Sequence, residues 1–175
     1  MGKGIDNIIK NIKAFGKDTE NHIDVVIKQT AEEIKANAKI NAPINNGKLN
    51  ESILSEKTEG KKLSYSIYVG GVARSYAPFV EFGTGKQVSV PPELKKIASQ
   101  FKGKGGGFEK GLQSIKDWCK NKGIDEKMAF PIFMSILKKG LKPRPFLYPA
   151  FLKGKKILKQ DLKDLLEDLT KKHNG

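Results

Sequence analysis

The sequence predicts an α+β fold. A small, mainly antiparallel β-sheet is packed by long N-terminal and C-terminal helices, and a basic helical insertion lies between them. Three observations predict this. Residues 18–41 and 149–171 repeat apolar side chains at helical spacing. Residues 63–69 alternate apolar and polar side chains, as a half-buried strand does. Residues 86–140 combine glycine, lysine and two shorter helical patterns.

The N-terminal helix is predicted in two parts. Residues 5–15 form a short amphipathic helix with isoleucines on one face, and Gly16 interrupts it. Asp18 or Thr19 then caps a long helix that ends before Pro43. Its apolar stripe consists of Ile23, Val26, Ile27, Thr30, Ile34 and Ala38.

The sheet is predicted to contain a hairpin. Residues 49–54 fit either a helical turn or the start of a strand. Residues 53–57 pair with 63–69 across a turn at residues 58–61. Two strands alone are only marginally stable in water, so we expect a third strand and a fourth. The candidates are residues 87–90 and 141–146.

The insertion is predicted at residues 86–140, within a single domain of residues 1–175. We expect residues 91–107, which hold six consecutive positions of glycine and lysine, to be flexible. A helix follows at residues 108–121. A second helix is capped by Asp125 and continues to residue 139, and it should start late or kink because Pro131 falls inside it.

Two blocks rich in aromatic residues and proline, residues 76–84 and 142–150, have a composition that fixes shape. In the first block, proline suits the first turn of a short helix and glycine suits its left-handed end. In the second block, prolines hold the residues before them extended, and Pro149 can open the last helix. The expected structural anchor residues are Tyr76, Phe79, Glu81, Phe82, Gly83, Pro145, Phe146 and Pro149.

We expect these two blocks to meet in the fold. Tyr76, Phe79 and Phe82 would then pack with Phe146 and Tyr148. Glu81 would cap a helix or pair with an arginine.

The C-terminal helix carries more leucine than one neighbouring element can cover. We therefore expect part of its apolar stripe to contact another subunit. The candidate interface residues are Leu158, Leu162, Leu165, Leu166 and Leu169.

The two blocks, in this order, resemble those of the tail-completion and head–tail joining (neck) proteins of long-tailed bacteriophages. This group includes the tail-completion protein of phage lambda and the HK-type minor tail components. A third block is similar: Ala42-Pro43, then Gly47-Lys48-Leu49-Asn50-Glu51-Ser52-Ile53, with Asn46 where the family usually has threonine. Residues 111–140 resemble a helical insertion of many members, so the resemblance spans residues 17–170.

The resemblance implies a structural protein of the virion tail or neck that forms a ring, with six copies, around the DNA passage. The implied partners are copies of itself and other neck and tail-tube proteins, with DNA only passing through the ring. The implied locations are the virion and, during assembly, the host cytoplasm. No apolar stretch approaches the length of about 18 residues that spans a bilayer, so we expect no membrane contact.

Catalysis has little support in the sequence. Glu81 is the only carboxylate between Lys61 and Pro92, so no acid–base pair is local there. Cys119 has no histidine near it in sequence, and His22 and His173 are too far apart to suggest a local metal site. We therefore expect no enzyme, no catalytic residue, no cofactor and no metal.

The alternative function is that of a basic DNA-binding accessory protein. The net charge is +14, and residues 86–156 hold 17 Lys and Arg against 5 Asp and Glu, a net of +12. Lysines that neutralise phosphates bind DNA without reading its sequence. However, only Arg74 and Arg144 are arginine, which disfavours bidentate contacts to phosphates or bases.

Overall fold

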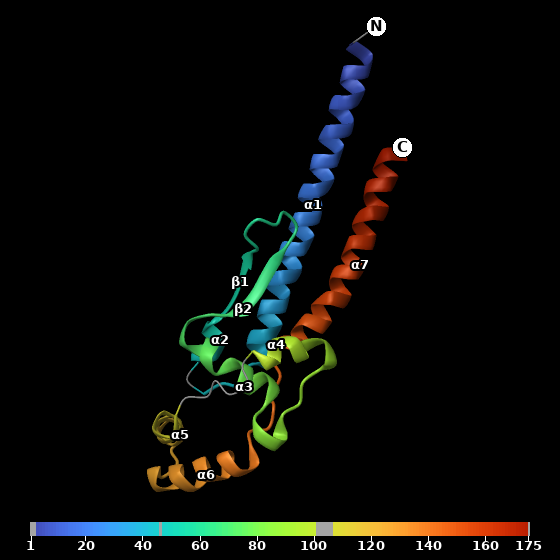
Figure 1. Ribbon diagram of the computed structural model, residues 1–175. Coiled ribbons are helices and arrows are strands. Elements are labelled where there is room, and N and C mark those ends of the chain that lie inside the picture. The colour runs from blue at the N-terminus through green and yellow to red at the C-terminus, as the bar shows by residue number, and fades with distance from the viewer. Residues whose placement is uncertain (1–2, 46, 101–106, 175) are drawn as a thin grey trace.

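The computed structural model describes residues 3–45, 47–100 and 107–174. The chain is α+β, with a two-stranded antiparallel sheet and long helices at both ends (Figure 1). The helices and strands are α1 (Lys3–Asn41), α2 (Lys48–Glu51), β1 (Ile53–Lys57), β2 (Tyr65–Val69), α3 (Ala77–Phe82), α4 (Lys95–Ser99), α5 (Phe108–Asn121), α6 (Ala129–Lys139) and α7 (Leu147–Asn174). Short 3₁₀ turns lie at Gly71–Ser75, Gly85–Gln87, Pro92–Leu94 and Glu126–Met128.

Helix α1 is continuous through Gly16, so the prediction of two separate helices was wrong. A glycine inside a helix costs only about 1 kcal/mol relative to alanine, and the good helix formers around it outweigh that cost. The helix ends at Asn41, before Pro43, as the sequence predicted.

The hairpin lies against α1. Its register pairs Ile53 with Val69 and Lys57 with Tyr65. The side chains that face α1 extend the contact with polar bonds: Lys57 Nζ lies 2.8 Å from Asp24 Oδ2, and Ser55 donates a hydrogen bond to Glu32. The short helix α2 directly precedes β1, so residues 49–54 contain both a helical turn and the start of a strand.

The third and fourth strands do not form among the described residues, so that prediction was wrong. Residues 85–87 are a 3₁₀ turn, and residues 141–146 have no regular structure. The second segment is instead drawn along the end of α3, where the Arg144 N–H donates to the carbonyl of Val80 at 2.7 Å. Helix α1 gives the hairpin the packing surface that more strands were expected to give.

Helix α7 runs beside α1 in the opposite direction, and α1 lies between α7 and the hairpin (Figure 1). The expectation that the last helix packs on the sheet was therefore wrong, because α7 packs mainly on α1. The two helices approach closely at Gly154, where a Cβ would overlap the side chain of Ile34. Ala38 and Ala150, at 0% and 1% exposure, also keep this interface narrow.

The main core collects small residues from many elements. It joins the C-terminal half of α1, α2, β1, the turn before α3, α3 itself and the start of α7. Its members are Ile34, Ala38, Ala42, Leu49, Ile53, Ala73, Ala77, Phe146 and Ala150. Phe146 is the largest side chain in this set, and it lies where the C-terminal half of α1 meets the start of α7.

The insertion is helical, and α5 and α6 pack on each other at the end of the molecule away from the chain termini (Figure 1). Cys119 and Ala129 are fully buried between them, and Phe108 meets Phe133 edge to face with ring centroids 5.0 Å apart. As predicted, α6 starts late, so that Pro131 stands in its first turn. The segment expected to be flexible is partly helical, at residues 92–99, and residues 101–106 lie outside the described residues.

Candidate functional site

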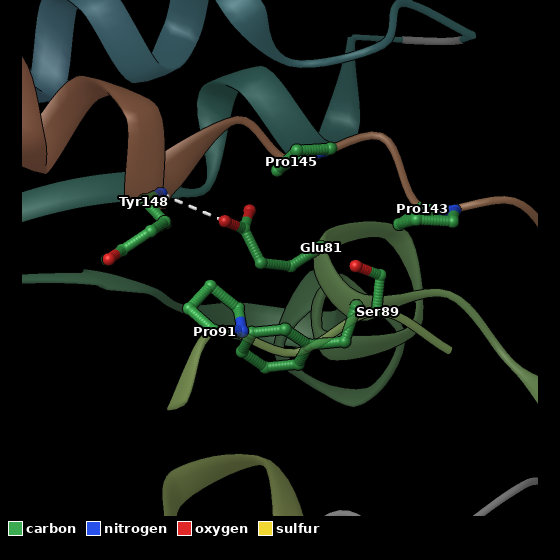
Figure 2. A pocket seen from close by; sticks show the side chains of 7 residues that line it. Glu81, Ser89, Pro91, Pro143, Pro145 and Tyr148 are labelled. Carbon is green, nitrogen blue, oxygen red and sulfur yellow. Dashed lines mark hydrogen bonds between the residues drawn. The ribbon is translucent and has the colours of Figure 1, made fainter. Parts of the chain in front are cut away.

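The two blocks singled out in the sequence meet at the start of α7, and Glu81 joins them. Its side chain comes from α3, is 7% exposed, and points at the first turn of α7 (Figure 2). Its two oxygens accept three backbone hydrogen bonds, from the N–H groups of Phe146 at 2.9 Å, Leu147 at 3.0 Å and Tyr148 at 2.9 Å. Glu81 therefore caps a helix, which is one of its two expected roles, rather than pairing with an arginine.

This cap accounts for every free N–H group at the start of α7. A helix leaves its first four N–H groups without a partner inside the helix. Three of these belong to the residues that donate to Glu81, and the fourth position is Pro149, which has no N–H. The positive end of the helix dipole also favours a carboxylate at this place. A buried negative charge is stable here because three donors replace its water.

Beside the cap, Thr84 and Leu141 lie side by side, at the two ends of the segment that contains the insertion. We call this pair the Thr84–Leu141 contact. The Thr84 N–H donates to the Leu141 carbonyl at 3.0 Å, and the Leu141 N–H donates to Thr84 Oγ1 at 2.8 Å. Gly83 has φ 75°, and a Cβ there would lie 2.7 Å from the Leu141 carbonyl oxygen. Gly140 has φ 83° and contacts Thr84 so closely that a Cβ would overlap its backbone. The insertion thus begins and ends at one point.

The predicted anchor aromatics divide into two groups. Tyr76 packs against the core that contains Phe146, which is 1% exposed. Phe82 and Tyr148 lie together on another side of the junction, where they line a cavity. Phe79 is half-buried and does not belong to the main core.

The cavity at the junction holds about 100 Å³ and is walled mostly by proline and aromatic side chains (Figure 2). Its lining residues are Glu81, Phe82, Ser89, Pro91, Pro143, Pro145 and Tyr148. Pockets that bind small molecules are usually about 300–1,000 Å³. The carboxylate in its wall is already used by the helix cap, so the arrangement fits a structural junction better than a reaction site.

A second contact fastens the insertion to α7. The Tyr148 hydroxyl donates a hydrogen bond to Glu93, which lies in the 3₁₀ turn before α4. This bond lowers the pKa of Glu93 and raises the pKa of Tyr148, because each shift keeps the donor protonated and the acceptor charged. Both groups lie at the surface, so the contact orients the turn and adds little to stability.

The candidate interface leucines of α7 lie at the edge of its contact with α1. Leu158, Leu162, Leu165 and Leu169 are half-buried, and Leu166 is 56% exposed. Sequence reasoning missed a second apolar surface on α6, where Phe130, Met134 and Leu137 are 54%, 43% and 55% exposed. The signal was present, because α6 has apolar residues on more than one face and α5 can cover only one of them.

Comparison with known proteins finds one similar family, over the N-terminal part of the chain. Residues 6–83 match the family model described as "Bacteriophage HK97-gp10, putative tail-component". This part of the chain is similar to that family. The match ends at Gly83, directly before the Thr84–Leu141 contact where the insertion begins, and covers somewhat less than half of the chain. It confirms the resemblance to phage tail proteins, and it indicates a structural tail component and hence a protein of the virion.

No curated protein and no solved structure matches the chain. Within the described residues, no set of three or more His, Cys, Asp and Glu side chains is placed to hold a metal ion. No helix in the same part of the chain is long and apolar enough to cross a membrane.

Proposed function

We propose that this chain is a tail-completion or head–tail joining protein that assembles as a ring around the DNA passage of a phage tail. The observation that carries the proposal is the HK97-gp10-like match over residues 6–83, which indicates a tail component. The ring, its six copies and its place at the neck come from the sequence resemblance. The partners would be further copies of the chain and neighbouring neck and tail-tube proteins, met in the host cytoplasm during assembly.

The distribution of apolar side chains supports self-association. The main core is built largely from alanines, whereas phenylalanine and leucine side chains on α6 and α7 stand partly in water. Exposed apolar surface of this kind typically marks a contact with another protein. A ring needs two unlike patches on each identical subunit, and the chain has apolar surface on both helices.

The test is the oligomeric state of the purified full-length chain. We expect light scattering over a range of concentrations to give a multiple of the 19.4 kDa subunit, and negative-stain images to show rings. A monomer at every concentration, together with absence of the chain from purified virions, would contradict the proposal.

The alternative is a basic DNA-binding accessory protein, which the net charge of +14 favours. Such a protein binds duplex DNA as an isolated chain, and its affinity falls steeply with salt. A ring component through which DNA only passes should bind duplex weakly before it assembles. Fluorescence anisotropy with a labelled duplex, on the same preparation as the light scattering, separates the two functions.

A further inference from the structure

We propose that α7 of one copy lies beside α7 of the next copy, so that a row of lysines on the first helix faces a row of aspartates on the second. The basic flank of α7 consists of Lys155, Lys159 and Lys163, and its acidic flank consists of Asp161, Asp164 and Asp168. The inference rests on the proposed function, and it names the two surfaces that meet when the chain self-assembles.

The two flanks lie on different sides of α7. Gly154 marks the line of α7 that faces α1, because a Cβ there would overlap the side chain of Ile34. At about 100° per residue, the three lysines are turned by roughly 100–180° from that line in one direction, and the three aspartates by roughly 20–80° in the other. Lys153 and Lys171 stand on the acidic side, before and after the aspartates. Between them, the helix presents opposite charge on its two sides.

Each flank is a row of like charges without a counter-charge. The lysines follow at spacings of four residues, and the aspartates at spacings of three and four. Like charges at these spacings repel and destabilise an isolated helix. None of the six residues forms an ion pair with another described residue, and Asp164 accepts a hydrogen bond only from the neutral side chain of Gln160. Opposite charges from a second chain would offset the repulsion in both rows.

The side of α1 next to the acidic flank does not carry lysine within residues 17–41. Lys153 Nζ, on the acidic side of α7, donates a hydrogen bond to Asn37 Oδ1 at 3.0 Å, so Asn37 marks that side of α1. Counted from Ile34, the lysines of this part of α1 are turned by roughly 100–140° the other way. They are Lys17, Lys28, Lys35 and Lys39. A row of lysines from a second copy would therefore meet the aspartates without meeting these lysines.

Apolar side chains accompany both flanks. Leu162 and Leu166 lie among the lysines, turned by roughly 80° and 120° from the line that faces α1, and Leu166 is 56% exposed. Half-buried Ile157 and Val26 lie on the acidic side. In paired helices, charged residues that border an apolar line set the choice and the orientation of the partner. The charges of these flanks favour contact with the unlike flank over contact with a copy of the same flank.

One helix cannot bring its own two flanks together, so the contact must form between copies. Figure 1 shows α1 on one side of the C-terminal half of α7 and no other described element beside it. Packed helices lie about 8–10 Å apart, which is within the Debye length at ordinary salt. The centres of the two rows, Lys159 and Asp164, differ by about 8 Å along the axis, so parallel helices need only a small shift. Contact between unlike patches continues from copy to copy and gives a ring when the rotation closes.

Analytical ultracentrifugation of the full-length chain, at low and high salt, tests the proposal. Lys159→Glu with Lys163→Glu reverses the basic flank, and Asp164→Lys with Asp168→Lys reverses the acidic flank. All four side chains are exposed, and circular dichroism verifies that each variant is folded. We expect each reversal to weaken association at least tenfold at low salt, and less at high salt because salt screens the charges.

The matched control is Lys110→Glu with Lys127→Glu. Both lysines are exposed in the insertion, and their reversal changes the net charge by the same amount as the reversal of the basic flank. We expect association of the control to stay within twofold of wild type. Equal weakening by the control would show that net charge, rather than the basic flank, governs association, and it would overturn the inference.

The chain that carries all four flank substitutions gives the sharpest result. Its two flanks have exchanged sign and its net charge is that of wild type, so it should associate as wild type does. An equimolar mixture of the two flank variants should also associate, because each variant supplies the charge that the other lacks. A folded chain with all four substitutions that stays monomeric would overturn the contact between the flanks.

The remaining outcomes separate this inference from the proposed function. A wild-type chain that never associates contradicts both. A wild-type chain that assembles, with every variant assembling equally well, overturns only the contact named here. A basic-flank variant that assembles normally but no longer binds a labelled DNA duplex would assign the lysines to DNA, and it would also overturn the inference.

Discussion

The α3–α7 junction and the α5–α6 helix pair differ in how far they bury the same kinds of side chain. At the junction, Phe146 is 1% exposed and the buried Glu81 carboxylate accepts three N–H groups. In the α5–α6 pair, Phe133 is 6% exposed but Phe130, three residues earlier, is 54% exposed. The junction completes its contacts inside one chain, whereas the α5–α6 pair leaves Phe130, Met134 and Leu137 exposed. Stability should therefore reside at the junction, and a capacity for contact with other subunits in the α5–α6 pair.

The largest test of this difference is Phe146→Ala. Removing a buried phenylalanine typically costs about 3–5 kcal/mol, which is a large share of an ordinary domain's stability. We expect the variant to unfold at much lower urea concentration or to be insoluble. Phe79→Ala, from the half-buried position on α3, should cost clearly less. Equal effects at the two positions would show that the junction is not centred on Phe146.

A smaller effect is expected from Glu81→Ala, which leaves the N–H groups at the start of α7 without their acceptor. A buried donor without a partner costs about 1–3 kcal/mol. Glu81→Gln keeps the volume and one acceptor oxygen, so it should fall between Ala and wild type in urea denaturation. Glu93→Gln is the matched control, because its exposed carboxylate also contacts α7 but caps nothing. A Glu81→Ala variant as stable as this control would mean that the cap contributes nothing.

The smallest effect on stability is expected from a substitution in the α5–α6 pair. Phe130→Ser removes a large apolar side chain that is 54% exposed, and substitutions at such surface positions usually stay within about 0.5 kcal/mol. Thermal unfolding of the dilute chain should therefore hardly change. A large drop in stability would place Phe130 among the residues that hold the fold, and it would erase the difference between the two regions.

The elements that local chemistry specifies were predicted well. Pro78 and Gly83 mark the start and end of α3, and the apolar spacing predicted α5 at its observed bounds, Phe108–Asn121. Residues 141–146 were a candidate for a further strand because two strands alone are only marginally stable, and because prolines hold the residues before them extended. Only the fold shows that this segment forms hydrogen bonds with the end of α3 and with Thr84.

The candidate site was predicted in part, for the same reason. Glu81 stood out in the sequence as an isolated carboxylate between apolar residues, so a capping role could be expected. Which helix it caps could not, because the donors lie 65 to 67 residues further along the chain. The exposed face of α6 was missed because periodicity reveals an apolar surface without telling which neighbour covers it.

The Thr84–Leu141 contact has a consequence for how this protein can change over evolutionary time. A loop whose two ends are already held side by side adds little entropic cost when it lengthens, about 0.6 kcal/mol for each doubling of its length. The match to the tail-component family stops at Gly83, directly before this contact. We therefore expect that residues 86–140 can be exchanged for a shorter or longer segment while the rest of the chain keeps its fold. Related tails could keep one body and vary what it presents to its neighbours.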